Sequence, residues 1–151
     1  MGDVAQAADT ERLLAAITKA LSPLPEVRAA LLFGSHAMGR ARANSDIDVA
    51  VLLDDETVRA PSHVVARPLL QALASELAAD RLDLVLLNDA PPALAFQVVK
   101  HGKLAFERDP RDLLAFRVRT YSRHSDREPV ERLFREAIRK RALAGVDHGE
   151  P

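Results

Sequence analysis

Two aspartates stand at the head of an apolar segment, where carboxylates need a partner. Asp46 and Asp48 open the segment DIDVAVLLD, residues 46–54, in which most of the other positions are apolar. Side chains two positions apart on a strand project to the same face, so the two carboxylates are expected side by side, with Ile47 in the core. Burying them is costly unless they are hydrogen-bonded, paired or bound to a metal. A divalent cation stabilises both anions, so the pair predicts a Mg²⁺ site for nucleotide chemistry.

A third carboxylate is available from the next apolar segment. Asp83 lies near the start of RLDLVLLND, residues 81–89. If the two strands are neighbours, Asp83 becomes a third ligand, and two metal ions about 3.5–4 Å apart can support in-line phosphoryl displacement. The alternative is a strand-edge aspartate bonded to nearby backbone. In that case catalysis, rather than the fold, would be in question.

A Gly-Ser pair closes the apolar run at residues 27–34 and suits phosphate binding. Gly34 allows close approach of a phosphate to the backbone, and Ser35 adds a hydroxyl donor. The N–H groups of a following helical turn attract anions, so this turn is predicted to hold the β- and γ-phosphates of a nucleoside triphosphate. Arg40 and Arg42 lie in the next loop, within reach of triphosphate oxygens, although exposed loop arginines without such a contact are commoner. His36 is expected to be a solvent-facing turn residue rather than a general base.

Helices and strands must alternate along the chain to position these residues. We expect a first helix capped by Asp9 or Thr10 and ended before Pro23, and a polar tail without fixed structure after Leu143. The near-continuous apolar character of residues 46–54 predicts cover on both faces of the sheet. Interleaved strands and helices indicate an α/β (α+β) class with helices packed on a small sheet. Further helices are predicted at 64–79 (with Pro68 near the first turn), 93–101, 109–121 and 129–143, and strands at 27–34, 46–54, 81–89 and 103–107.

Composition excludes several other classes of site. With 151 residues, 48% of them hydrophobic, the chain fits one domain with an ordinary core. The sequence has no cysteine, which rules out disulfides, thiolate zinc sites and a cysteine nucleophile. A net charge of −1 gives no overall attraction to nucleic acid or membranes. The acidic N-terminus and the absence of a membrane-length apolar run lead us to expect a cytoplasmic protein.

The motif as a whole resembles a known family. GSHAMGRARANSDID matches the pattern Gly-Ser, ten residues, Asp-x-Asp of the nucleotidyltransferase superfamily related to DNA polymerase β. The short chain looks like the minimal nucleotidyltransferases, the antitoxin partners of HEPN-type ribonuclease toxins. The specific similarity covers roughly residues 27–89, and the C-terminal third matches only loosely. The matching positions are Gly34, Ser35, Ala37, Gly39, Ser45, Asp46 and Asp48.

The resemblance carries expectations about fold, chemistry and partner. It implies a nucleotidyltransferase fold with a small mixed sheet: one domain over residues 1–151, with a core at about 10–108 and a helical segment at about 109–144. It implies Mg²⁺-dependent transfer of AMP from ATP to tyrosine of a HEPN-type toxin, which silences the toxin's ribonuclease activity. By position, Gly34 and Ser35 hold phosphates, Asp46 and Asp48 ligate the metal, and Asp83 matches the place of a third ligand.

Two other functions fit the same sequence. The acceptor could be a small-molecule hydroxyl, as in aminoglycoside nucleotidyltransferases, although the short segment after Asp109 leaves little room for a substrate domain. The chain could also neutralise its partner by binding alone. Residues 111–141 contain ten Lys or Arg and five Asp or Glu, which is either a solvated surface or a face for an acidic protein partner. Direct nucleic-acid binding is not expected, because no aromatic stacking platform accompanies the charge.

Overall fold

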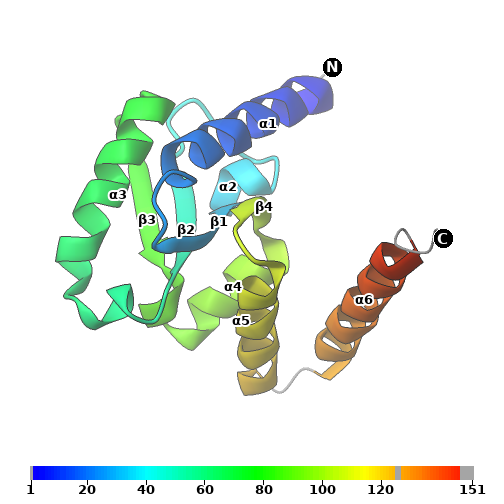
Figure 1. Ribbon diagram of the computed structural model, residues 1–151. Helices are drawn as coiled ribbons and strands as arrows, with labels where there is room; N and C mark the ends of the chain where they lie inside the picture. Colours follow the sequence, from blue (N-terminus) through cyan, green and yellow to red (C-terminus); the bar gives the residue numbers. More distant parts are fainter. Residues whose placement is uncertain (1, 125–126, 147–151) are drawn as a thin grey trace.

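The computed structural model describes residues 2–124 and 127–146 as a mixed sheet with helices on both faces (Figure 1). Its class agrees with the α/β (α+β) prediction. In chain order the elements are α1 (Gly2–Leu21), β1 (Val27–Phe33), α2 (Gly34–Ala37), β2 (Ile47–Leu53), the 3₁₀ turn η1 (Thr57–Arg59), α3 (Ser62–Leu77), β3 (Leu82–Leu86), the 3₁₀ turn η2 (Leu87–Asp89), α4 (Pro92–His101), β4 (Lys103–Glu107), α5 (Pro110–Arg123) and α6 (Arg127–Val146).

The sheet has the strand order β3-β2-β1-β4. β1 runs antiparallel to β2 and to β4, whereas β2 and β3 are parallel. A parallel pair requires a crossover connection, and α3 lies in the connection between β2 and β3. The register pairs Asp48 of β2 with Phe33 of β1 and with Asp83 of β3. Asp48 therefore lies beside the end of β1 on one side and beside Asp83 on the other.

Each face of the sheet is covered by its own pair of helices. Val49 and Val51 of β2 pack with α1 and α3, whereas Ala50 and Leu52 pack with α4 and α5. Figure 1 shows α1 and α3 together on one side and α4 and α5 on the other. This arrangement confirms the prediction that the apolar part of residues 46–54 is covered on both faces of the sheet.

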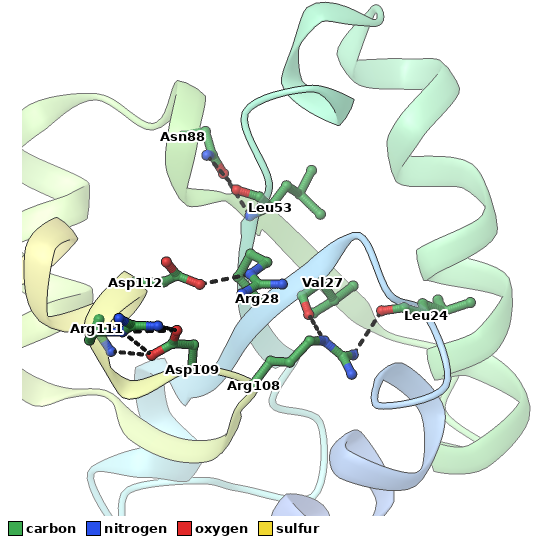
Figure 2. Close-up of polar contacts among 9 residues, drawn as sticks. All are labelled: Leu24, Val27, Arg28, Leu53, Asn88, Arg108, Asp109, Arg111 and Asp112. Atoms are coloured by element: carbon green, nitrogen blue, oxygen red, sulfur yellow. Dashed lines mark hydrogen bonds and ion pairs between the residues drawn. The ribbon is translucent and has the colours of Figure 1, made fainter.

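Polar side chains lock the ends of the strands (Figure 2). Arg108, which follows β4, donates to the carbonyl oxygens of Ser22, Leu24 and Val27 at 2.9, 3.0 and 3.1 Å. Arg28 of β1 pairs with Asp112 of α5 at 2.7 Å. These contacts fix β4 and α5 to the chain that enters β1.

Asn88 of η2 secures the far end of β2, and its removal should destabilise the fold. The amide of Asn88 donates to the Leu53 carbonyl oxygen at 3.0 Å and accepts from the Leu53 N–H at 2.9 Å (Figure 2). Asn88→Ala leaves two part-buried backbone groups unpaired, so we expect the free energy of unfolding to fall by about 1–3 kcal/mol. Urea denaturation measures this, with the exposed Asn44→Ala as control. Equal urea midpoints for Asn88→Ala and Asn44→Ala would contradict the proposed stabilising role of Asn88.

The predicted start of the first helix is wrong. α1 begins at Gly2, and neither Asp9 nor Thr10 caps it. Asp9 instead pairs with Arg12 within the helix at 2.6 Å, and Thr10 is buried and donates to the His36 carbonyl oxygen at 3.4 Å. Residues 3–8 contain no proline or glycine, so nothing in the sequence interrupts the helix before Asp9.

Other boundaries differ from the prediction by a few residues. α3 begins at Ser62, which places Pro68 inside the helix rather than in its first turn. β3 ends at Leu86, because residues 87–89 form η2. α6 continues to Val146, so the predicted unstructured tail is wrong for residues 144–146, and its remainder at 147–151 lies outside the described residues. No helix in the described ranges is both long and apolar enough to cross a membrane.

Candidate functional site

The fold brings Asp46, Asp48 and Asp83 to the same end of β2 and β3. Asp48 and Asp83 are register partners on parallel strands, and neighbouring strands lie about 4.8 Å apart. Asp46 is exposed and directly precedes β2, one residue outside the strand that was predicted to contain it. Ile47 projects to the opposite face, where it joins the core under α1 and α3, as predicted. The carboxylates therefore lie on the face covered further along by α4 and α5.

The three carboxylates act on one another electrostatically. Burial raises the pKa of Asp48, and the negative charges of Asp83 and Asp46 raise it further, while His36 lowers it. Like charges held this close disfavour the ionised state of the central carboxyl group. A bound cation would reverse that preference, because it stabilises all three as anions.

The side chains of Asp46, Asp48 and Asp83 are chemically suited to Mg²⁺, because carboxylate oxygens are the ligands that Mg²⁺ prefers. In residues 2–124 and 127–146, no group of three His, Asp or Glu side chains is arranged so that it could hold a metal ion. The backbone nevertheless sets Asp48 beside Asp83, and side-chain rotation alone repositions carboxylate oxygens. The fit therefore depends on the strand register and on the donor chemistry.

Gly34, the first residue of the Gly-Ser turn, lies against the carboxylate of Asp48. It begins α2 with φ +71°, a conformation that favours glycine, and a Cβ at this position would collide with Oδ2 of Asp48. The collision arises because Phe33, the residue before Gly34, is the register partner of Asp48. Ser35 follows at the start of α2, half-buried. The two halves of the sequence motif are thus in direct contact.

The loop between the two halves is held by its own hydrogen bonds. Ser45 Oγ accepts from the Arg42 N–H at 2.8 Å, and the Ser45 N–H donates to the Arg42 carbonyl oxygen at 3.0 Å. Arg81 fixes the other side, since its carbonyl oxygen accepts from the Ile47 N–H at 3.0 Å and its guanidinium donates to the Asn44 carbonyl oxygen at 3.0 Å. Sequence reasoning missed this positioning role of Arg81, and the only signal was its place directly before β3.

The two loop arginines are exposed and occupy different places. The Arg40 N–H donates to the Ser35 carbonyl oxygen at 2.9 Å. Arg42 lines a cleft of about 350 Å³ with Arg12, His36 and Arg81. That cleft is lined by neither Gly34 nor any of the three aspartates, so the structure does not bring the Arg42 side chain to the Gly-Ser turn.

His36 does not face solvent, contrary to the prediction. Its side chain is only 12% exposed, and Nδ1 lies 3.9 Å from Oδ2 of Asp9 on α1. The burial follows from the first turns of α1, which sequence reasoning left out of the helix. His36 thereby adds a titratable group beside Asp48, although its ring contacts the α1 side of the molecule.

Known proteins share both the sequence and the fold. The family model for polymerase beta nucleotidyltransferases matches residues 15–111, a range that contains Asp46, Asp48 and Asp83, the Gly-Ser turn and its loop. The protein adenylyltransferase MntA of Shewanella oneidensis is 33% identical over 127 residues, which cover 84% of this chain and 87% of the relative.

Two solved structures are similar over most of the chain. One is a toxin–antitoxin complex with AMP-PNP, with a TM-score of 0.62 and 34% identity over 86% of this chain and 98% of the other. The second is a tri-AMPylated Shewanella oneidensis HEPN toxin in complex with MNT antitoxin, with a TM-score of 0.55 and 29% identity. In that comparison the match covers 95% of this chain and 99% of the other.

Proposed function

The chain belongs to the polymerase beta nucleotidyltransferase family, and from that membership we propose that it is an antitoxin that transfers AMP from ATP to tyrosine of a HEPN-type toxin. The observation that carries the proposal is the contact between Gly34 and the Asp48 carboxylate. It joins a turn suited to phosphates to a row of carboxylates suited to metal ions. The MntA relative and the AMPylated toxin complex support transfer to a protein.

Each residue has a distinct task in this proposal. Asp46, Asp48 and Asp83 hold Mg²⁺, which supplies charge neutralisation at the triphosphate when bound. Gly34 lets the β- and γ-phosphates approach the backbone, and Ser35 donates to them. Arg40 and Arg42 are proposed to reach triphosphate oxygens, although the position of the Arg42 side chain in its cleft gives no support to that contact.

The reaction breaks a phosphoanhydride bond of ATP and forms a phosphoester bond to tyrosine. The tyrosine oxygen attacks the α-phosphate, a bond forms between them, and the bond from the α- to the β-phosphate breaks. The products are AMP-tyrosine, pyrophosphate and a proton. Positioning and electrostatic stabilisation account for most of the expected rate enhancement. The need for ATP is consistent with a cytoplasmic site of action.

A small-molecule acceptor has less support than a protein acceptor. The relative named above is a protein adenylyltransferase, and the AMP groups in the solved complex are on a toxin. We propose that residues of about 10–108 form the catalytic core and that the helical segment at about 109–144 adds to the surface facing the toxin.

Intact-mass spectrometry tests the transfer directly. The chain is mixed with its HEPN-type partner toxin and with Mg-ATP, and the toxin is expected to gain the mass of one or more AMP groups on tyrosine. Chelation of the metal with EDTA should abolish the gain, and added Mg²⁺ should restore it. An ATP analogue with a methylene bridge between the α- and β-phosphates serves as control, since it has no cleavable bond there. A stable complex with an unchanged toxin mass would show that the chain acts by binding alone.

A further inference from the structure

A groove between α5 and α6 is unused by the proposed chemistry. We call it the α5–α6 groove, and its volume is about 520 Å³. Figure 1 shows α6 as the outermost helix, beyond α5. Its lining residues are Glu107, Pro110, Arg111, Leu114, Arg117, Leu133, Phe134, Glu136, Ala137, Ile138, Lys140 and Arg141.

Large apolar side chains of α6 are exposed at this groove. Phe134 is 50% exposed and Ile138 is 66% exposed, and both line it. They are four residues apart on a helix, so they lie on the same face one turn from each other. Leu133, a neighbour of Phe134, also lines the groove and packs against the core beneath α5. Helix α6 therefore uses one edge to attach to the domain and leaves a second apolar edge uncovered, which is typical of an interaction surface.

A buried guanidinium nitrogen in the groove lacks a partner. Arg117 Nε of α5 is buried and forms no hydrogen bond within the described residues. A buried donor without a partner is unfavourable, whereas a carboxylate binds a guanidinium with strong charge-assisted hydrogen bonds. The lining contains four cationic side chains and two acidic ones, and although Arg111 is paired with Asp109, the remaining cations still outnumber the acids, so an acidic ligand is favoured. The cations are Arg111, Arg117, Lys140 and Arg141, and the acidic residues are Glu107 and Glu136.

We propose that the α5–α6 groove docks an amphipathic segment of the HEPN-type toxin. Aliphatic side chains of that segment cover Phe134 and Ile138, and a carboxylate binds Arg117. The identity of the partner rests on the proposed function. A second copy of this chain fits less well, because a symmetric contact would place two cationic linings against each other. Docking on α5 also suits the chemistry, since α5 packs on the sheet face that carries the carboxylates.

Affinity measurements with groove variants test the proposal. The full chain carrying Phe134→Glu and Ile138→Glu should bind its HEPN-type partner toxin at least tenfold more weakly than wild type, because two apolar contacts are replaced by charges that face the toxin's own carboxylate. Arg117→Met, which keeps an apolar stem but removes the donors, should also weaken binding about tenfold. The control is Val64→Glu on α3, a side chain 55% exposed on the other face of the sheet, which should bind like wild type.

The outcomes separate the groove from the proposed function. If wild type binds and transfers AMP while the groove variants bind within twofold of it, the docking proposal is wrong and the function stands. If wild type binds but transfers nothing, and the variants bind weakly, the groove stands and the catalytic proposal is wrong. If wild type does not bind the HEPN-type protein, both are rejected. Circular dichroism and thermal unfolding verify that each variant is folded, which is expected because Phe134 and Ile138 are exposed.

Discussion

Replacing Asp46 and Asp48 together with asparagine should abolish AMP transfer and leave the chain folded. Asparagine keeps the size of each side chain but removes the charge that holds a divalent cation. Loss of the metal removes several kcal/mol of transition-state stabilisation, so transfer of label from α-³²P-ATP to the toxin should fall roughly a thousandfold or more. Asp55→Asn, in the exposed turn after β2, is the matched control and should retain activity. Unchanged transfer in the double variant would disprove the site.

The same double variant should be more stable than wild type when no metal is present. Burial and the charges of Asp83 and Asp46 raise the pKa of Asp48. A raised pKa means that the folded state holds the proton more tightly than the unfolded state, so stability falls as pH rises above the ordinary range of the carboxyl group. At pH 7 in EDTA the asparagine variant does not carry the cost of ionising Asp48 in the folded state. Its urea denaturation midpoint should therefore be higher than that of wild type. The difference should vanish below about pH 3, where both states are protonated in wild type. Loss of activity together with lower stability would instead indicate unfolding.

The aspartates and the Gly-Ser turn could be predicted from the sequence because their signals are local. The alternation of a strand places Asp46 and Asp48 on one face and Ile47 on the other, and the structure has Ile47 in the core as expected. Apolar content on both faces of β2 likewise predicted helices on both sides of the sheet. These inferences need only the spacing of residues within one element.

The relations between elements could not be predicted in the same way. The pairing of Asp48 with Asp83 depends on a parallel alignment of β2 and β3 that no short pattern specifies. The burial of His36 and Thr10 depends on the first turns of α1, which have no capping residue to mark their start. Arg81 holds Asn44 through its guanidinium and Ile47 through its carbonyl oxygen, and both partners offer only backbone groups, which leave no signal in residue types. The contact of Gly34 with Asp48 likewise follows from strand register alone.

Gly34→Ala should reduce both AMP transfer and stability, through backbone strain and through a collision with Asp48. Gly39→Ala should show the effect of backbone strain without that collision. Both glycines have positive φ, +71° and +68°, so alanine costs about 1–2 kcal/mol of backbone strain at either position. A Cβ at position 39 meets only the flexible end of Gln6, at 3.3 Å, whereas one at position 34 collides with the Asp48 carboxylate. The additional loss at position 34 should therefore measure the displacement of Asp48.

The expected loss of transfer in Gly34→Ala is about a hundredfold relative to Gly39→Ala, since a shift of about 1 Å in a positioned group is enough for that effect. A double-mutant cycle locates the cause. In an Asp48→Ala background the carboxylate is gone, so adding Gly34→Ala should reduce the free energy of unfolding by no more than Gly39→Ala does. Urea denaturation of the four chains of the cycle gives the coupling. A coupling of zero would mean that glycine serves only the backbone at this turn, and that the two halves of the site are not in contact in solution.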